Sequence, residues 1–298
     1  MNSGKLHVSI IIPTFRDWHR LHLCMNALAK QTFPASMFEV IIVNNDPQDL
    51  IPEEITSNLN AHFKIINEYK SGSYAARNAG IRIAKGNILG FTDSDCLPAE
   101  DWIENAVRIF EQTDVDRIAG HIEVFYEKSI VPTLAELYEK VFAFKQEEVV
   151  KTRNAAVTGN MFAKRAVFDK VGLFDEILYS GGDYEWGERA FADGCSITYG
   201  GDVIIHHPAR KTVKELLKKA RRVGGGSGNT FSGNKSAAMK DYILLFKPDS
   251  FAVRMIKNYG KGLSFIQKSK VFFLRFYIRH ILKFEKLKVS LGKQASRT

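Results

Sequence analysis

The first 120 residues alternate between short apolar runs and longer segments with helical spacing, and this alternation constrains the fold more than any other feature. Mostly apolar runs of four or five residues followed by Pro, Asn or Asp are typical of buried strands. Such runs occupy residues 8–12, 40–43, 63–66 and 88–92. Helix-like segments occupy residues 18–31, 52–59, 74–84, 102–112 and 133–150. The alternation predicts an α/β fold, with a mostly parallel central sheet flanked by helices on both faces.

Candidate ligand-binding residues follow three of the predicted strands. They are Pro13-Thr14-Phe15, Asn44-Asn45-Asp46 and Asp93-Ser94-Asp95. Because ligands of such sheets bind beyond the carboxyl ends of the strands, we expect these residues to share one binding site.

The Asp93-Ser94-Asp95 motif places two carboxylates directly after a buried strand. Carboxylates at this spacing can chelate Mg²⁺ or Mn²⁺, which in turn neutralises a diphosphate. The same spacing recurs at Asp114 and Asp116, but there it follows a predicted helix. We interpret that second copy as a solvated turn.

A glycine and a serine open the predicted helix at residues 74–84. Gly72 and Ser73 leave backbone N–H groups free for phosphate or sugar oxygens, and Arg77 can reach an anion. The alternative is a capped helix that carries a surface arginine.

Two later motifs also carry chemical groups. Gly181 and Gly182 precede Asp183, an arrangement that suits either a helix cap or a mobile catalytic base. His206 and His207 follow a strand-like run, where a histidine is either structural or part of a metal site.

In this order the motifs resemble the family 2 glycosyltransferases, which are inverting enzymes with a GT-A fold. The matching stretches lie between residues 6 and 225: VSIIIPTFRD, KQTFP, FEVIIVNND, GSYAARNAGIRIAKGNILGFTDSD, GNMFAKRAVFDKVGLFDE, GGDYEWGERAFADG and DVIIHHPAR. The resemblance implies a Rossmann-like GT-A domain over residues 1–225. A basic, helical C-terminal region over residues 226–298 would follow it.

The resemblance also implies roles for individual residues. It implies a nucleotide-sugar donor site formed by Pro13, Thr14, Phe15, Asn44, Asn45, Asp46, Arg77, Asp93 and Ser94. It implies a divalent metal, Mn²⁺ or Mg²⁺, held by Asp93 and Asp95 with His207 as a further ligand. Asp183 corresponds to the aspartate that acts as the general base.

The sequence departs from the family pattern at two places. The family usually has Asp where this chain has Asn44 or Asn45, which leaves the nucleotide open, with uridine diphosphate as the default. It also usually has an acidic residue where this chain has Gly182, which leaves Glu185 as an alternative base to Asp183.

The expected reaction is hexosyl transfer from a nucleotide-diphosphate sugar to a hydroxyl group of a glycan or lipid-linked acceptor, in cell-surface polysaccharide synthesis. The alternatives are a nucleotide-sugar-binding protein without turnover and a protein that binds nucleic acid through its basic C-terminal part. We expect no nucleic-acid partner, because the predicted strand ends carry acids and the sequence has no recognised nucleic-acid-binding motif. Dehydrogenase and kinase classes are excluded, since neither glycine-rich nucleotide-binding motif occurs.

The charge is unevenly distributed along the chain. The net charge is +9, but residues 211–298 hold 21 Lys and Arg against 4 Asp and Glu, while residues 1–210 carry a net −8. Within residues 264–288, basic side chains recur at helical spacing among aromatic ones: Lys268, Arg275, Arg279, Lys283 and Lys286. Such a helix either lies on an anionic membrane surface or packs on the catalytic body with its charges solvated.

Cysteine use and hydropathy indicate the compartment. Cys24, Cys96 and Cys195 are too far apart for a disulfide framework or a zinc motif, which favours a reducing cytosol. No apolar run approaches the roughly 18 residues of a membrane span, and Pro13 ends the first run too soon for a signal peptide. We therefore expect a cytoplasmic protein, peripheral to the inner face of the cell membrane if the basic helix binds lipid.

Overall fold

The computed structural model describes residues 7–57, 59–127, 131–229, 235–244, 247 and 249–293. Contacts within the chain divide it into two compact units. Unit 1 comprises Met1–Glu123, Phe144–Ile177 and Gly182–His207. Unit 2 comprises Val124–Ala143, Leu178–Gly181 and Pro208–Thr298. The domain boundary that the resemblance placed at residue 225 stays a prediction.

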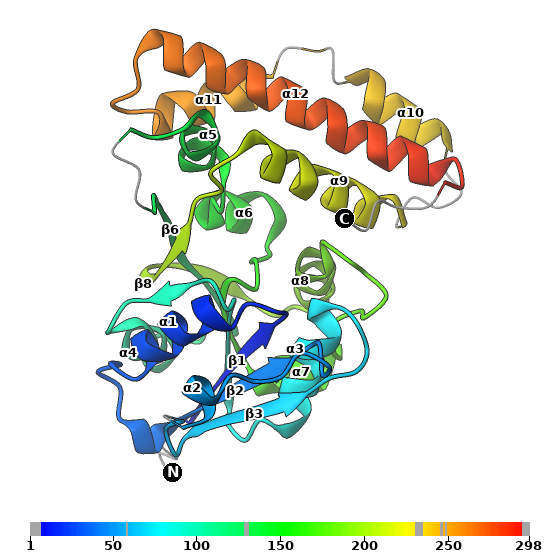
Figure 1. Cartoon of the computed structure of the whole chain (residues 1–298). Coiled ribbons are helices and arrows are strands. Elements are labelled where there is room, and N and C mark those ends of the chain that lie inside the picture. The colour runs from blue at the N-terminus through cyan, green and yellow to red at the C-terminus, as the bar shows by residue number, and fades with distance from the viewer. Residues whose placement is uncertain are drawn as a thin grey trace. The chain divides into compact units, whose positions relative to one another are not determined.

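An eight-stranded sheet runs in the order β3-β2-β1-β4-β7-β6-β8-β5 (Figure 1). Its parallel part is formed by β1 (Val8–Thr14), β2 (Phe38–Asn44), β3 (Phe63–Asn67) and β4 (Ile88–Thr92). These are the four strands predicted from the sequence. Antiparallel pairing then extends the sheet through β7 (Asn160–Lys164), β6 (Arg117–Phe125), β8 (Ile197–Pro208) and β5 (Leu97–Pro98).

Helices cover both faces of the parallel strands because alternate side chains point to opposite faces. In β2, Val40 and Ile42 join the large core cluster that includes residues of α1 (Trp18–Leu28) and α4 (Trp102–Gln112). Ile41 and Val43 pack instead with Ala76 of α3 (Ser73–Ile83). Between β2 and β3 lies the short helix α2 (Glu53–Thr56), where the sequence predicted a helix over residues 52–59.

Close packing of α3 on the sheet depends on a glycine. A Cβ at Gly80 would lie 2.6 Å from Cγ2 of Ile11 in β1, closer than carbon atoms approach. On the same unit, α7 (Arg165–Val171) and α8 (Gly182–Ala192) are joined by Phe168 and Trp186, whose stacked rings lie 4.3 Å apart. These contacts hold α3 and α8, which both carry predicted site residues.

The segment 133–150, predicted as one helix, is two helices, and that prediction is wrong. It forms α5 (Leu134–Phe142), which a Thr133–Glu136 capping box starts, and α6 (Gln146–Arg153). Between them Phe144 has a φ of 50°, which a helix does not allow. Its ring lies 4.4 Å from that of His207, so a tertiary contact accompanies the break.

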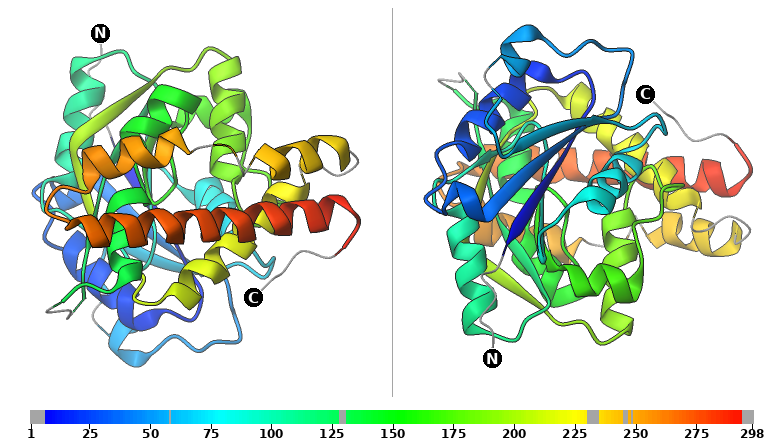
Figure 2. Two further views of the ribbon diagram at one scale, coloured as in Figure 1. Left: turned by 90° about the horizontal axis from the view of Figure 1, so that it is seen from above. Right: turned by 90° about the horizontal axis from the view of Figure 1, so that it is seen from below.

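Unit 2 contains the basic helices of the C-terminal part: α9 (Val213–Asn229), α10 (Lys235–Ile243), α11 (Ser250–Tyr259) and α12 (Phe265–Ser290). The long helix α12 packs against α9, α10, α11 and α5 (Figure 2). Gly224, Gly225 and Gly226 lie inside α9, and a Cβ at Gly224 would lie 2.3 Å from the Leu282 carbonyl oxygen. Glycine therefore allows the backbones of α9 and α12 to approach closely. Within the described ranges, no helix is long and apolar enough to cross a membrane.

Candidate functional site

The parallel strands place the predicted donor residues at one edge of the sheet. Thr14 and Asn44 are register partners at the carboxyl ends of β1 and β2, and Asp93 directly follows β4. Pro13 lies within β1 and is half-buried. Phe15, just beyond the strand, is 57% exposed, so its ring is available to a ligand.

Asn45 ties the end of β2 to the loop before α3. Its side-chain amide donates to the carbonyls of Glu68, at 3.0 Å, and Lys70, at 2.8 Å, while its Oδ1 accepts the Gly72 N–H at 2.8 Å. An aspartate could not make the two donated bonds. This is a physical reason for asparagine here.

Asn44 and Asp46 shape the neighbouring turn. Asn44 Oδ1 accepts the backbone N–H of Asp46 at 3.0 Å. The Asp46 carboxylate lies 2.5 Å from Nε of Arg16, and the Arg16 guanidinium stacks over the Phe15 ring at 5.3 Å. The turn thus presents an aromatic ring and an ion pair beside the strand ends.

Arg77 is a buried cation in the centre of this edge. It is 4% exposed, its Nη1 donates to the Ser73 carbonyl at 3.2 Å, and its Nη2 pairs with the Asp93 carboxylate. Among the described residues, Nε of Arg77 and the hydroxyls of Thr14 and Thr92 are buried without a hydrogen-bond partner. Because such groups are costly to leave unpaired, they suit a polar ligand. Thr92 was missed in the sequence, although it precedes the acidic motif directly.

The two aspartates of the acidic motif have different partners. Asp93 pairs with Arg77, whereas Asp95 lies beside His207. Asp95 Oδ2 lies 3.7 Å from Nε2 of His207, which is 4% exposed. Cys96 completes a group whose possible ligand atoms all lie within 4.8 Å of one another. Ser94 sits in the turn between the two aspartates, and the Cys96 N–H bonds the Asp93 carbonyl at 3.1 Å.

A divalent cation fits this donor set. A carboxylate and an imidazole suit Mn²⁺, and a carboxylate alone suits Mg²⁺. Burial and the charges of Asp93 and Asp95 raise the pKa of the Cys96 thiol well above its usual value. The structure therefore brings together Asp95 and His207, while Asp93 is paired with Arg77.

Asp183 is held at the first turn of α8. It is 9% exposed, and burial raises the pKa of its carboxyl group, opposed by the charge of Arg77. Its Oδ1 accepts the Tyr74 hydroxyl at 3.2 Å and the Tyr184 backbone N–H at 3.0 Å. Tyr74 was not singled out in the sequence, because nothing local connects it to a residue 109 positions away.

Glu185 has a different environment from Asp183. Both of its oxygens accept from Arg189, at 2.6 and 3.1 Å. Arg189 in turn donates to the carbonyls of Val171 and Leu173, at the end of α7. Glu185 is thus part of an ion pair that fastens α8 to α7.

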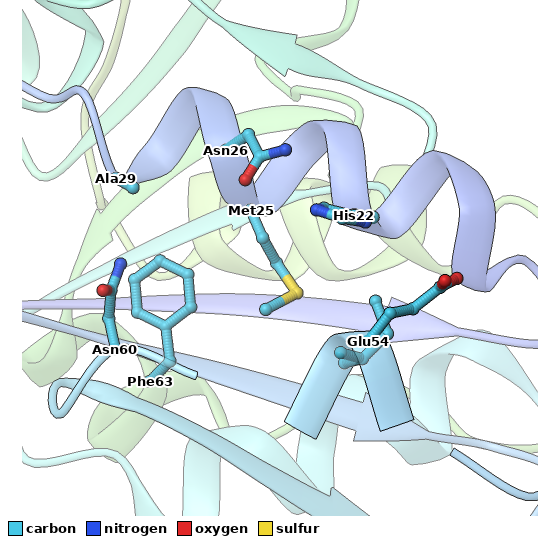
Figure 3. Close-up of a pocket in the computed structure, with 8 residues that line it drawn as sticks. His22, Met25, Asn26, Ala29, Glu54, Asn60 and Phe63 are labelled. Atoms are coloured by element: carbon cyan, nitrogen blue, oxygen red, sulfur yellow. The ribbon is translucent and has the colours of Figure 1, made fainter. Parts of the chain in front are cut away.

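A small pocket elsewhere in unit 1 contains none of the predicted site residues (Figure 3). It lies between α1, α2 and β3, and residues lining it include His22, Met25, Glu54 and Phe63. Polar and apolar side chains line it in equal number.

The chain is similar to known proteins in both sequence and structure. The sequence model of glycosyl transferase family 2 matches residues 9–172. The chain is 40% identical over 229 residues to the glycosyltransferase AglE of Haloferax volcanii, covering 76% of this chain and 74% of AglE. It is 26% identical over 125 residues to the Escherichia coli UDP-Glc:alpha-D-GlcNAc-diphosphoundecaprenol beta-1,3-glucosyltransferase WfgD, covering 42% of this chain and 49% of WfgD.

The structure is similar to that of the mannosyltransferase PcManGT from Pyrobaculum calidifontis, solved in complex with GDP-Man and Mn²⁺. The TM-score is 0.59 at 16% sequence identity, and the match covers 97% of this chain and 75% of that chain. This likeness confirms the predicted fold class.

Proposed function

Because this chain belongs to glycosyl transferase family 2, we propose that it moves a sugar from a nucleotide-diphosphate donor to a hydroxyl group with inversion at the anomeric carbon. The chain is a glycosyltransferase with a GT-A fold. One observation carries the finer proposal: Arg77 pairs with Asp93 of the acidic motif and also acts electrostatically on the buried Asp183. The guanidinium of Arg77 therefore acts on both Asp93, a proposed donor-binding residue, and Asp183, the candidate base.

Asp183 is the general base of this proposal. Burial raises the pKa of its carboxyl group, which makes its carboxylate a stronger proton acceptor than an exposed one. It takes the proton of the acceptor hydroxyl, whose oxygen bonds to the anomeric carbon as the bond to the nucleotide breaks. Glu185 is the weaker candidate, because Arg189 occupies both of its oxygens.

The donor diphosphate meets the acidic motif. Asp95 and His207 would hold a divalent cation, with Asp93 nearby, and such a cation neutralises negative charge on a diphosphate. Arg77 and the buried hydroxyls of Thr14 and Thr92 offer hydrogen-bond donors at the same edge. In this proposal the exposed ring of Phe15 stacks on the nucleobase of the donor. Asn44, Asn45 and Asp46 shape the part of the site that holds the nucleotide. We propose Mn²⁺ or Mg²⁺ as the cation.

The donor nucleotide is proposed as uridine diphosphate, and the acceptor as a lipid-linked glycan. The name of WfgD gives UDP-Glc as its donor and a sugar on diphosphoundecaprenol as its acceptor. PcManGT, which is similar in fold, was solved with GDP-Man, so a guanosine donor is the alternative. In this proposal the site binds the glycan part of the lipid-linked acceptor.

Four of the five basic residues predicted for a membrane surface are paired within unit 2. The pairs are Arg275 and Arg279 with Asp249, and Lys283 and Lys286 with Asp241. These cations stabilise the packing of α12 on α10 and α11. They are therefore less available to lipid than the sequence suggested.

A membrane contact through residues 264–288 then rests on apolar side chains. Ile266, Phe273, Tyr277 and Phe284 are all exposed on α12, and their spacing of seven, four and seven residues places them on one stripe of the helix. We propose that this stripe enters the interface of an anionic membrane, while the net charge of +17 on residues 211–298 attracts the protein to it.

The base assignment is tested with Asp183→Asn and the control Glu185→Gln, each assayed for sugar transfer and for donor binding. We expect Asp183→Asn to lose roughly 100- to 10,000-fold in kcat while the donor Kd stays within about twofold. Glu185→Gln should keep most of its turnover but lower the melting temperature. Near-normal turnover of Asp183→Asn would overturn the assignment of the base.

Donor class and metal dependence are tested by thermal stability with nucleotide diphosphates and nucleotide sugars, with and without Mn²⁺. A ligand at about 100 times its Kd stabilises by about 2.7 kcal/mol. We expect one uridine nucleotide to stabilise the protein only with the metal, and Asp95→Ala to abolish the effect. Stabilisation by guanosine nucleotides instead would replace the proposed donor, and no response to any nucleotide would contradict the site.

Membrane binding is tested by sedimentation with phosphatidylglycerol-containing vesicles. We expect Phe273→Ser combined with Tyr277→Ser to weaken binding at least about 10-fold, because apolar burial of two rings is lost. The control Phe191→Ser removes an exposed ring from α8 and should bind as wild type does. Equal binding of all three proteins would exclude the stripe as the contact.

A further inference from the structure

We propose that Tyr74 is the positioning residue of Asp183, and that its ring occupies the volume that a side chain at position 182 would need. The inference rests on the proposed role of Asp183 as the base. It assigns the orientation of that base to a residue on a different helix, α3. Neither the acidic motif nor the glycine pair before Asp183 supplies this orientation.

The Tyr74 hydroxyl makes two contacts with the same residue. It donates to Oδ1 of Asp183 at 3.2 Å and accepts the backbone N–H of Asp183, also at 3.2 Å. The hydroxyl therefore holds both the carboxylate and the main chain at the start of α8. Tyr74 is 5% exposed, and its ring lies 5.7 Å from that of Phe174, so the hydroxyl is itself fixed by packing.

The Tyr74 ring leaves no room for a side chain at position 182. A Cβ at Gly182 would lie 2.8 Å from Cε2 of Tyr74 and 3.0 Å from both Cδ2 and Cζ. Carbon atoms do not approach this closely without displacement of the ring. Glycine at 182 and tyrosine at 74 thus form a matched pair, which accounts for the absence of an acidic side chain before Asp183.

The hydroxyl favours the ionised form of the base. A hydrogen bond donated to a carboxylate stabilises its negative charge, so Tyr74 opposes the effect of burial on Asp183. Among the described residues, Arg77 from α3 and Tyr184 from α8 also act on Asp183. A backbone hydrogen bond from Thr158 favours the ionised form of Asp183 as well. Tyr74 keeps its own proton throughout, because burial raises the pKa of its phenol.

The test compares Tyr74→Phe with wild type across pH. Loss of one hydrogen bond to a charged group corresponds to roughly 10-fold in kcat. We expect that loss with the donor KM within about twofold. We also expect the acidic limb of the kcat profile to move to higher pH, because the carboxyl group has lost a bond that favours ionisation. Tyr199→Phe is the control, since it loses a 2.8 Å bond to His121 in the same unit and should leave the profile unchanged.

A second pair of variants tests the steric part. Gly182→Ala should lower kcat and the melting temperature in the wild-type background, and should cost less when combined with Tyr74→Ala, because the clash is then relieved. Additive effects of the two substitutions, or an unshifted pH profile of Tyr74→Phe, would overturn the proposal. If Asp183→Asn itself retained normal turnover, the proposed base would be wrong. If Asp183→Asn is inactive and the Tyr74→Phe profile is unshifted, only the positioning role is wrong.

Discussion

Substitution of Asn45 by aspartate tests how the end of β2 holds the donor edge together. The Asn45 amide donates to two carbonyl oxygens, at 3.0 and 2.8 Å, and the residue is 9% exposed. Asn45→Asp loses both donated bonds and directs a carboxylate oxygen towards the carbonyls. Each lost bond costs about 0.5–1.5 kcal/mol, so loss of the two bonds should lower the free energy of unfolding by about 1–3 kcal/mol.

The assay is thermal and urea denaturation at several pH values. The expected loss corresponds to a fall in melting temperature of about 2–12 °C. The introduced carboxyl group can donate to a carbonyl only when protonated, so its pKa is raised in the folded state. The folded state then binds the proton more tightly than the unfolded state, and the variant should regain stability as the pH falls from about 7 to 5.

Asn67→Asp is the matched control at the end of the neighbouring strand β3. Its side chain is exposed, so water solvates the introduced carboxylate. We expect a cost below about 1 kcal/mol and no gain at low pH. Equal losses in the two variants, or an Asn45→Asp variant without pH dependence, would refute the hydrogen-bonding argument.

Three further results are expected. Gly224→Ala should destabilise by about 1–3 kcal/mol despite the better helix propensity of alanine, because its Cβ meets the Leu282 carbonyl oxygen; urea denaturation measures this, and a gain in stability would contradict it. Burial alone would raise the pKa of Asp249, but the Ala252 N–H, Arg275 and Arg279 lower it, so wild type should lose stability between about pH 5 and 2 as this group protonates. Asp249→Ala should be less stable at pH 7 and lose less on acidification; parallel pH curves would disprove that. Removal of divalent cations with a chelator should stop sugar transfer, and Mn²⁺ should restore it; full activity in the chelator would exclude the metal.

Local patterns were sufficient for the parallel half of the sheet. The strands β1 to β4 and helix α4 begin and end close to where hydropathy and turn residues predicted, because each is marked by its own residues. The prediction failed at residues 133–150, where apolar periodicity continues but Phe144 leaves the helix and packs on His207. A contact across more than 60 residues leaves no mark on local periodicity.

The candidate site also has features that the sequence predicts and features that it does not. The residue types and their order along the chain could be predicted, since strand ends and glycine pairs are visible in the sequence. Their partners could not. That Asp93 pairs with Arg77, and Asp95 with His207, depends on which strands are neighbours in the sheet.

By itself, the sequence determined the α/β class, the family and the edge of the sheet at which the predicted site residues lie, because these depend on periodicity and on motifs that are continuous in the chain. Only the tertiary structure decided that Tyr74 meets Asp183, that Arg189 pairs with Glu185 and that Asp241 and Asp249 pair with four basic residues of α12. The physical reason is that the charge and proton affinity of a side chain depend on its neighbours and its burial. Folding chooses those neighbours from distant parts of the chain.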